Sequence, residues 1–203
     1  PNCGKTTMFN ALTGANQYVG NWPGVTVEKK EGRLKGKRGK GEDIIVTDLP
    51  GIYSMSPYTL EEVVSRDYVL KENPDVIIDL VDATNIERNL YLTTQLIETG
   101  VPVVIALNMA DLLEKRGIKI DVKRLSMLLD CPIIETSALK GEGLDKLIDE
   151  AVKTAKKSSV DLPKEIFSKE MEEAVSEVKK VLPESITEDK KRWYAVKFLE
   201  NDE

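Results

Sequence analysis

Four short apolar runs, each ending in polar residues and each followed by a helical pattern, constrain the fold of this chain more than any other feature. The runs are EDIIVTDL, DVIIDLVDA, VPVVIALN and CPIIETSA. Runs of this length are typical of strands that are buried on both faces. Repeated strand–helix units therefore predict an α/β fold, with a mostly parallel sheet and helices on both of its faces.

Capping signals locate two of the expected helices. Thr59 with Glu62 forms a capping-box pattern, so a helix should begin directly after Thr59. Thr84 with Glu87 forms the same pattern and predicts a second capping box. Gly100 is expected to end the helix that this second box opens.

Two segments ahead of the first apolar run carry weaker signals. ANQYVGNWPGVTVE is rich in Gly, Asn and Pro and has no clean period, which indicates a loop. VEKKEGRLKG is charged and interrupted by Gly32. We therefore expect it to be an edge strand at best.

The pattern changes near Lys156. KKSSVDLP is typical of a linker, and the apolar residues beyond it follow helical spacing alone. RWYAVKFLE starts a further helix, which is expected to run into the end of the chain at Glu203. The sequence thus predicts two domains, an α/β domain over residues 1–157 and a small all-helical domain over residues 158–203 that is truncated at its C-terminus.

The composition excludes several kinds of chemistry. The 203 residues include no His and only two Cys, Cys3 and Cys131, which lie far apart. This excludes Ser-His-Asp and Cys-His catalysis, His-ligated zinc and a disulfide framework. The formal net charge of −6 argues against nucleic acid as a partner.

The opening stretch PNCGKTT matches the last positions of the phosphate-loop pattern G-x-x-x-x-G-K-[ST]. In that pattern Gly4 lets the backbone approach a phosphate, Lys5 reaches the β- and γ-phosphates, and the Thr6 hydroxyl binds magnesium. Taken alone, the stretch is better explained as an ordinary helix start. The predicted phosphate-binding residues are Asn2, Cys3, Gly4, Lys5, Thr6 and Thr7.

The first Gly of the pattern falls before Pro1, so the strand that leads into such a loop is expected to be missing from this chain. The P-loop fold that this pattern resembles has that strand in a central position, between the strands predicted at IIVTDL and VIIDLVD. These two strands are then expected to be separated by two strand spacings, roughly 10 Å, unless the domain rearranges.

Three further motifs follow buried strands. DLPG places Asp48 where its carboxylate can hold magnesium through water, and Gly51 where its amide can sense a γ-phosphate. NMAD places Asp111 where it can accept hydrogen bonds from guanine N1 and N2, which adenine cannot supply. SALKG offers backbone amides to the guanine carbonyl. The predicted base-binding residues are Asn108, Met109, Asp111, Ser137, Ala138 and Leu139.

Each motif also has a simpler explanation: a turn that contains Asp, a helix N-cap at Asp111, or a plain turn. Their order along the chain, and their place at the carboxyl ends of strands where α/β sheets bind ligands, make a joint coincidence improbable. The sequence therefore predicts a magnesium-dependent domain that binds guanine nucleotides.

The set PNCGKTT, DLPG, NMAD and SAL resembles the translation-factor-related (TRAFAC) GTPases, which are Ras-like P-loop NTPases. YVGNWPGVTVE, DLPGIYSMSPYTLEE and DATNIERNLYLTTQLIETG resemble the cytosolic GTPase domain of the ferrous iron transport protein B family, over residues 1 to about 155. The helical tail is similar to the helical domain of that family, a spacer that resembles a GDP-dissociation inhibitor (GDI). The resemblance implies a GTPase (G) domain that binds GTP and GDP at the cytoplasmic side of a membrane protein. It also implies a membrane permease, absent from this chain, as partner, and oligomerisation stays open.

The resemblance implies further roles. Thr26 matches a threonine that contacts magnesium and the γ-phosphate, and Asn2 with the carbonyl groups of Gly20 and Trp22 matches a potassium site. Many GTPases orient water with a Gln where this chain has Ile52, so hydrolysis would depend on the phosphate-loop lysine and bound cations. The implied catalytic residues are Lys5, Asn2, Thr26 and Gly51; the implied ligands are Thr6, Thr26 and Asp48 for Mg²⁺ and Asn2, Gly20 and Trp22 for K⁺.

Several alternatives accompany these roles. Asn2 is alternatively a loop residue that bonds its own backbone, and Trp22 a packing residue. Met109 stands where the base-binding motif usually has Lys, so its packing over a base would be aliphatic. No stable Fe(II) site is expected, because Glu61 with Glu62 is better explained as a solvated helix face.

Two other functions remain as alternatives. One is a nucleotide-gated regulatory module whose hydrolysis is incidental, which Ile52 favours. The other is a TRAFAC GTPase of ribosome assembly or tRNA modification. The acidic charge balance and the segment GNWPGVTVE count against the second alternative.

Overall fold

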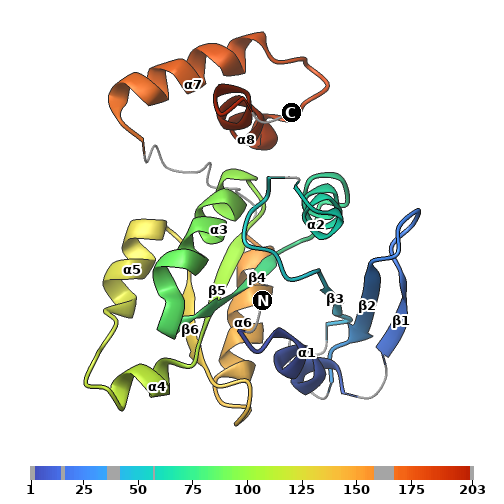
Figure 1. Ribbon diagram of the computed structural model, residues 1–203, viewed down its shortest axis with the longest axis vertical. Helices are drawn as coiled ribbons and strands as arrows, with labels where there is room; N and C mark the ends of the chain where they lie inside the picture. The colour runs from blue at the N-terminus through green and yellow to red at the C-terminus, as the bar shows by residue number, and fades with distance from the viewer. Residues whose placement is uncertain (1–2, 15–16, 36–41, 57, 158–166, 202–203) are drawn as a thin grey trace.

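The computed structural model describes residues 3–14, 17–35, 42–56, 58–157 and 167–201. Helices and strands alternate over most of this length, and two helices follow at the end (Figure 1). The elements are α1 (Lys5–Thr13), β1 (Gln17–Asn21), β2 (Glu28–Arg33), β3 (Ile45–Asp48), α2 (Leu60–Lys71), β4 (Ile77–Asp82), the 3₁₀ turn η2 (Ala83–Asn85), α3 (Ile86–Glu98), β5 (Val103–Asn108), α4 (Ala110–Glu114), α5 (Val122–Leu129), β6 (Ile133–Thr136), α6 (Leu144–Ala155), α7 (Lys169–Val181) and α8 (Glu188–Leu199).

Three of the four apolar runs form the predicted parallel sheet, as β4, β5 and β6 in that order. The prediction of a buried strand for the first run, EDIIVTDL, was wrong, because it forms β3 of an antiparallel sheet and Ile45 is 62% exposed. The register pairs Asp82 with Asn108 and Asn108 with Thr136 at the carboxyl ends of the three strands. Because parallel strands end at the same edge, the segments after β5 and β6 leave the sheet side by side. This register brings the motifs NMAD and SALKG together.

A second, antiparallel sheet has the order β1-β2-β3. The prediction of a loop over the segment that contains Gln17–Asn21 was wrong, because these residues form strand β1. The prediction of an edge strand at Glu28–Arg33 was also wrong, because β2 is the middle strand. Its charges are accommodated by ion pairs along the strand, Lys29 with Glu31 at 2.8 Å and Lys30 with Glu28 at 2.9 Å.

The two sheets are separate. Among the described residues, the only strand that pairs with β3 is β2, and the only strand that pairs with β4 is β5. This separation agrees with the first of the two expectations for IIVTDL and VIIDLVD, which was a gap between these strands.

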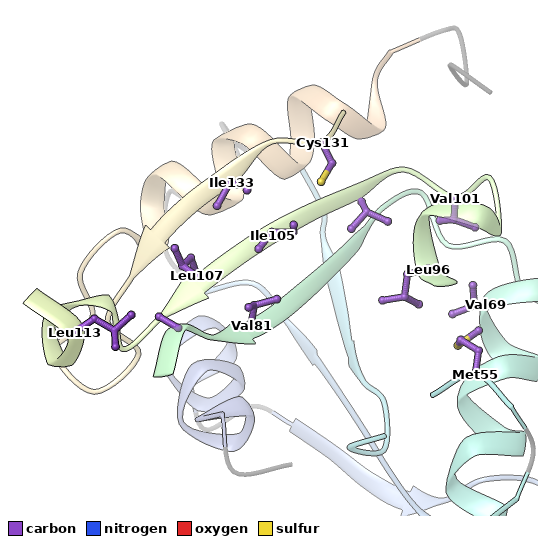
Figure 2. Packing of buried hydrophobic residues seen from close by; sticks show 12 residues of the cluster. Met55, Val69, Val81, Leu96, Val101, Ile105, Leu107, Leu113, Cys131 and Ile133 are labelled. Carbon is purple, nitrogen blue, oxygen red and sulfur yellow. The ribbon is translucent and has the colours of Figure 1, made fainter. Parts of the chain in front are cut away.

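The core lies on both faces of the parallel sheet, because residues of β5 point alternately to the two sides. Val103, Ile105 and Leu107 pack in one cluster with residues of α3, α4 and α5 (Figure 2). Val104 and Ala106 pack in a second cluster with α1 and α6. All five side chains are buried. The predicted arrangement of helices on both faces is thus confirmed (Figure 1).

One predicted capping box is present and the other is not. The Thr59 hydroxyl accepts a hydrogen bond from the Glu62 amide, and the Glu62 carboxylate accepts one from the Thr59 amide. The prediction for Thr84 with Glu87 was wrong. The carboxylate of Asp82 accepts both the amide and the hydroxyl of Thr84, at 2.8 and 2.7 Å, so a 3₁₀ turn forms and α3 begins at Ile86.

The two C-terminal helices pack on each other through Val175, Ala195 and Val196. The prediction of a helix that runs to the end of the chain was wrong. Helix α8 ends at Leu199, and Asn201 adopts a left-handed conformation with φ 56°. Left-handed residues are common just after helix ends.

Helix α8 docks on the C-terminal end of α3. Gly100 has φ +79°, and a Cβ atom there would lie 2.5 Å from the backbone oxygen of Asp189. Only glycine permits this approach. Arg192 of α8 lies between Glu98 of α3 and Glu172 of α7, and it forms hydrogen-bonded ion pairs with both.

None of the helices in the described part of the chain has the length and apolar character needed to span a membrane.

Candidate functional site

The N-terminus of α1 is open to an anion. Gly4, the N-cap residue, has φ 91°, and the carbonyl of Gly4 accepts the amide of Met8 at 2.9 Å to start the helix. The first turn of α1 has no acidic side chain. Its free amides and the helix dipole therefore favour a negatively charged ligand.

Asn108 joins the two loops that the sequence assigns to phosphate and base. Its Nδ2 donates to the carbonyl of Cys3 at 2.8 Å, and its Oδ1 accepts the amide of Ala138 at 3.0 Å. The side chain is buried. A Cβ atom on Gly4 would lie 2.8 Å from Asn108 Nδ2, so glycine at this position permits the contact. Asn108 is thus a structural bridge rather than an exposed contact for a base.

Lys5 and Asp48 meet at the carboxyl end of β3. Lys5 Nζ lies 2.5 Å from Asp48 Oδ1, and the Asp48 side chain is only 10% exposed. The next residue in α1, Thr6, is exposed. The predicted phosphate-binding lysine and the predicted magnesium-binding carboxylate are therefore neighbours, although they lie 43 positions apart in the sequence.

The predicted base-binding residues surround the start of α4. Met109 is its N-cap, with φ 64°, and Asp111 lies in its first turn. Lys140, from the loop after β6, donates to Asp111 Oδ2 at 3.2 Å. Ser137 pairs with Glu142 in an isolated bridge that shapes this loop. Leu139, also in this loop, is 89% exposed.

Three of the residues that the family resemblance implies, Gly20, Trp22 and Thr26, lie in β1 or in the connection that follows it. Gly20 lies in β1, opposite Lys29. The carbonyl of Trp22 accepts the amide of Val25 at 3.2 Å, and Thr26 is exposed in the connection between β1 and β2. Asn2 lies outside the described residues. The potassium site stays a prediction.

The side chain of Trp22 has a packing role, as its simpler explanation proposed. It is 8% exposed and contacts the ring of Tyr68 edge-on, with 5.3 Å between ring centroids. Lys29 Nζ lies 4.9 Å from the centre of the Trp22 ring.

The segment after DLPG is held from two sides, which the sequence analysis missed. Gln95 Oε1 of α3 accepts the amide of Met55 at 2.8 Å and the hydroxyl of Ser54 at 3.2 Å. Lys197 of α8 donates to the Ser56 hydroxyl at 3.2 Å. No sequence signal links Lys197 to a serine 141 residues earlier.

Comparison with known families settles the membership of this chain. Residues 1–151 match the family model described as Ferrous iron transport protein B, and residues 167–203 match the model of the FeoB cytosolic helical domain. The chain belongs to the FeoB family. The resemblance that the sequence motifs carried is thereby confirmed.

Relatives in the FeoB family are longer than this chain. The Fe(2+) transporter FeoB of Escherichia coli K12 is 40% identical over 206 residues, which cover 100% of this chain and 26% of the relative. That of Salmonella typhimurium is 48% identical over 151 residues, which cover 72% of this chain and 19% of the relative. The chain thus spans about a quarter of the length of such relatives.

Solved FeoB structures share the fold. An NFeoB mutant of S. thermophilus bound to mGDP is 51% identical, with a TM-score of 0.93 over 100% of this chain and 76% of the other. The cytosolic domain of T. maritima FeoB in GMPPNP form is 39% identical, with a TM-score of 0.88 over 100% and 79%. The fold class predicted from the sequence, an α/β P-loop fold followed by helices, is confirmed.

Replacing Asn108 with alanine tests the bridge between the two loops. The variant leaves the Cys3 carbonyl and the Ala138 amide without their partner, so we expect a loss of about 1–3 kcal/mol in the free energy of unfolding and at least about tenfold weaker binding of guanine nucleotide. Urea unfolding and titration with fluorescent GDP measure the two effects. Asn10→Ala, on the exposed side of α1, is the control, and an Asn108 variant that behaves like it would contradict the bridging role.

Proposed function

We propose that this chain is a G domain with part of a helical domain, and that it binds GTP and GDP and hydrolyses GTP. The observation that carries the proposal is the bridge from Asn108 to both loops, since it joins the residue before the proposed phosphate-binding helix N-terminus to the loop proposed to bind the base. Membership of the FeoB family and similarity to NFeoB structures bound to nucleotides support it.

The nucleotide is proposed to lie along the carboxyl ends of the strands. Its phosphates bind the amides at the start of α1 and the ammonium group of Lys5. Its base contacts Asp111 and the loop that contains SALKG. A carboxylate that accepts two guanine donors rejects adenine, because adenine leaves it unpaired. The proposed binding residues are Asn2, Cys3, Gly4, Lys5, Thr6, Thr7, Asn108, Met109, Asp111, Ser137, Ala138 and Leu139.

The donor set near β3 fits magnesium. Magnesium in nucleotide sites is held by one or two protein oxygens and by the phosphates of the substrate. The Asp48 carboxylate lies beside Lys5, and the Thr6 hydroxyl is exposed at the start of α1. We propose Thr6, Asp48 and Thr26 as its ligands. When bound, magnesium neutralises charge on the phosphates, while Lys5 binds the same groups.

Hydrolysis is proposed to depend on cations rather than on a water-orienting side chain. Ile52, at the position of the usual Gln, is partly buried and packs against the core cluster of Figure 2. We propose that the Gly51 amide binds the γ-phosphate and that potassium, held by Asn2 and the carbonyl groups of Gly20 and Trp22, stabilises the charge that develops during hydrolysis.

The domain boundary and the cellular role are parts of the same proposal. We propose residues 1–157 as the G domain and residues 158–203 as the helical domain. Relatives named Fe(2+) transporter suggest that the intact protein takes up ferrous iron, and the match to a cytosolic helical domain suggests that this part faces the cytoplasm and regulates a membrane permease. The expectation that this chain holds no stable Fe(II) site stays a prediction.

One observation favours a second candidate, a nucleotide-gated module with incidental hydrolysis. Ile52 offers no group that orients water, and the segment just after it is fixed to α3 and α8 by Gln95 and Lys197. In this alternative, occupancy of the site by GTP is the signal and turnover is a slow side reaction.

Turnover in potassium and in sodium separates the two candidates. GTP hydrolysis by the protein is expected to be faster in potassium by about tenfold or more, because a cation beside the phosphates stabilises the transition state. Asn2→Ala is expected to remove the acceleration, while Asn10→Ala keeps it. Binding of GTP with turnover that ignores both the cation and Asn2→Ala would refute the potassium mechanism and favour the regulatory module.

A further inference from the structure

The carboxylate assigned to guanine already has a cationic partner within the chain. Lys140 Nζ donates to Asp111 Oδ2 at 3.2 Å. The Lys140 side chain is 51% exposed and that of Asp111 35% exposed, so both are accessible from solvent. Lys140 belongs to the motif SALKG, in which only the backbone amides were expected to contact guanine.

The position of Lys140 is fixed by the loop that carries it. The amide and carbonyl of Ser137 pair with Glu142 at 3.0 and 3.2 Å, and the Lys140 amide donates to the Ser137 hydroxyl at 3.4 Å. The amide of Ala138 is held by Asn108. These contacts fix the backbone of Lys140 in this loop, while its flexible side chain allows the ammonium group to move away from Asp111.

The ion pair occupies a carboxylate oxygen of Asp111 that a guanine base would also bind. A carboxylate that recognises guanine accepts one hydrogen bond at each oxygen, from N1–H and from N2–H. An ammonium group at Oδ2 therefore competes with one of these two guanine hydrogen bonds. The hydrogen bond to Asp111 raises the pKa of Lys140, so the lysine remains charged at neutral pH and does not release Asp111 by losing a proton.

We propose that Lys140 is an intramolecular competitor of the guanine base: its ammonium binds Asp111 before the nucleotide does and must leave as the base enters. Lys140 thereby slows nucleotide association and weakens affinity for both GTP and GDP. This inference rests on the proposed guanine-nucleotide site. It assigns to Lys140 a tuning role in that site.

The size of the effect follows from the exposure of the pair. Ion pairs between partly exposed side chains shift an equilibrium by up to about fivefold. Salt screens such a pair strongly, because the Debye length falls from about 10 Å at 0.1 M to about 3 Å at 1 M. The competition should therefore fade as ionic strength rises, which a purely structural role of Lys140 would not produce.

Stopped-flow association of fluorescent GDP tests the proposal with Lys140→Gln. The variant is expected to bind about two- to fivefold faster than the unsubstituted protein at low salt, with a similar dissociation rate, and the ratio should approach one at high salt. Lys140→Arg keeps the cation and should retain slow association. The matched control is Lys153→Gln, which removes the same charge from an exposed pair with Glu150 on the last turn of α6.

The outcomes are separable. Equal or slower association of Lys140→Gln, or a gain that persists at high salt or that Lys153→Gln shares, would overturn the competitor role while leaving guanine-nucleotide binding intact. Slower association would mean that Lys140 contacts the base instead. Failure of the unsubstituted protein to bind GDP or GTP would overturn the proposed function, and the competitor role with it.

Discussion

Replacing Arg192 with methionine is expected to destabilise the docking of the C-terminal helices by about 3–5 kcal/mol. The side chains of Arg192, Glu98 and Glu172 are 7%, 6% and 10% exposed. Arg192 donates to Glu98 at 2.5 and 3.4 Å and to Glu172 at 2.7 and 2.9 Å. Methionine fills similar space but leaves two buried carboxylates next to each other without a cation.

The charge state of the network supports a large effect. Burial raises the pKa of Glu98 even though Arg192 opposes the rise, and the hydrogen bond to Glu172 is the main cause that raises the pKa of Arg192. Without Arg192, burial and the neighbouring Glu172 raise the pKa of Glu98 with no cation to oppose them. The loss in stability should therefore shrink as the pH falls and the carboxylates become neutral.

Denaturant unfolding and hydrogen exchange in α8 measure this loss. The control is Arg33→Met, because the ion pair between Arg33 and Asp43 is 71% and 66% exposed and should contribute less than about 1 kcal/mol. If Arg192→Met and Arg33→Met cost the same, the network does not hold the helices on α3.

Replacing Asp79 with asparagine is expected to stabilise the protein above neutral pH by up to about 3 kcal/mol. Asp79 lies in β4 and is 7% exposed. It has no cationic partner among its described contacts, and Thr93 of α3 donates to its Oδ2 at 2.5 Å. Burial raises the pKa of Asp79 from 3.8 to about 6.

The direction of the pH dependence follows from this raised pKa. Below pH 3.8 the carboxyl is protonated in both states, and between 3.8 and about 6 only the folded state keeps the proton. Its contribution to stability is therefore fully present at low pH and is lost as the pH rises through about 6. The neighbouring thiol of Cys131 adds no charge, because burial raises its pKa to about 12.

Unfolding free energies between pH 5 and pH 8 test this prediction. The amide of asparagine can still accept the Thr93 hydroxyl, so the gain of Asp79→Asn should be largest at the upper end of this range. Asp75→Asn, at an exposed position before the same strand, should change stability by less than about 0.5 kcal/mol. Parallel profiles for Asp79→Asn and the unsubstituted protein would show that Asp79 does not titrate between the two states.

The pattern of apolar runs was sufficient to predict the parallel sheet but not the antiparallel one. Strand β5 is buried along its whole length, and β4 and β6 carry buried and partly buried apolar residues, so these residues carry the signal. Strands β1 and β2 are held by ladder hydrogen bonds and by ion pairs between alternate charged residues. A charged strand has no apolar period, which is why the sequence indicated a loop and an edge strand there.

Helix capping likewise shows one feature that the sequence predicted and one that it missed. The box of Thr59 and Glu62 forms with the two reciprocal hydrogen bonds that the sequence pattern predicts. At Thr84, the carboxylate of Asp82 at the end of β4 accepts the Thr84 amide, which the carboxylate of Glu87 was expected to accept. The same carboxylate also accepts the Thr84 hydroxyl. Strand ends offer acceptors that a helix pattern alone does not reveal.

The sequence by itself determined the α/β class, the family and the order of the motifs, since apolar runs and motif spacing are local properties of the chain. Only the tertiary structure decided which motif residues meet. The bridge of Asn108 from Cys3 to Ala138, the pair of Lys140 with Asp111 and the network around Arg192 join residues 29 to 105 positions apart, except for the 20-residue step from Glu172 to Arg192. Such contacts depend on how strands pair and helices dock, because the closing of long loops leaves no local signal in the sequence.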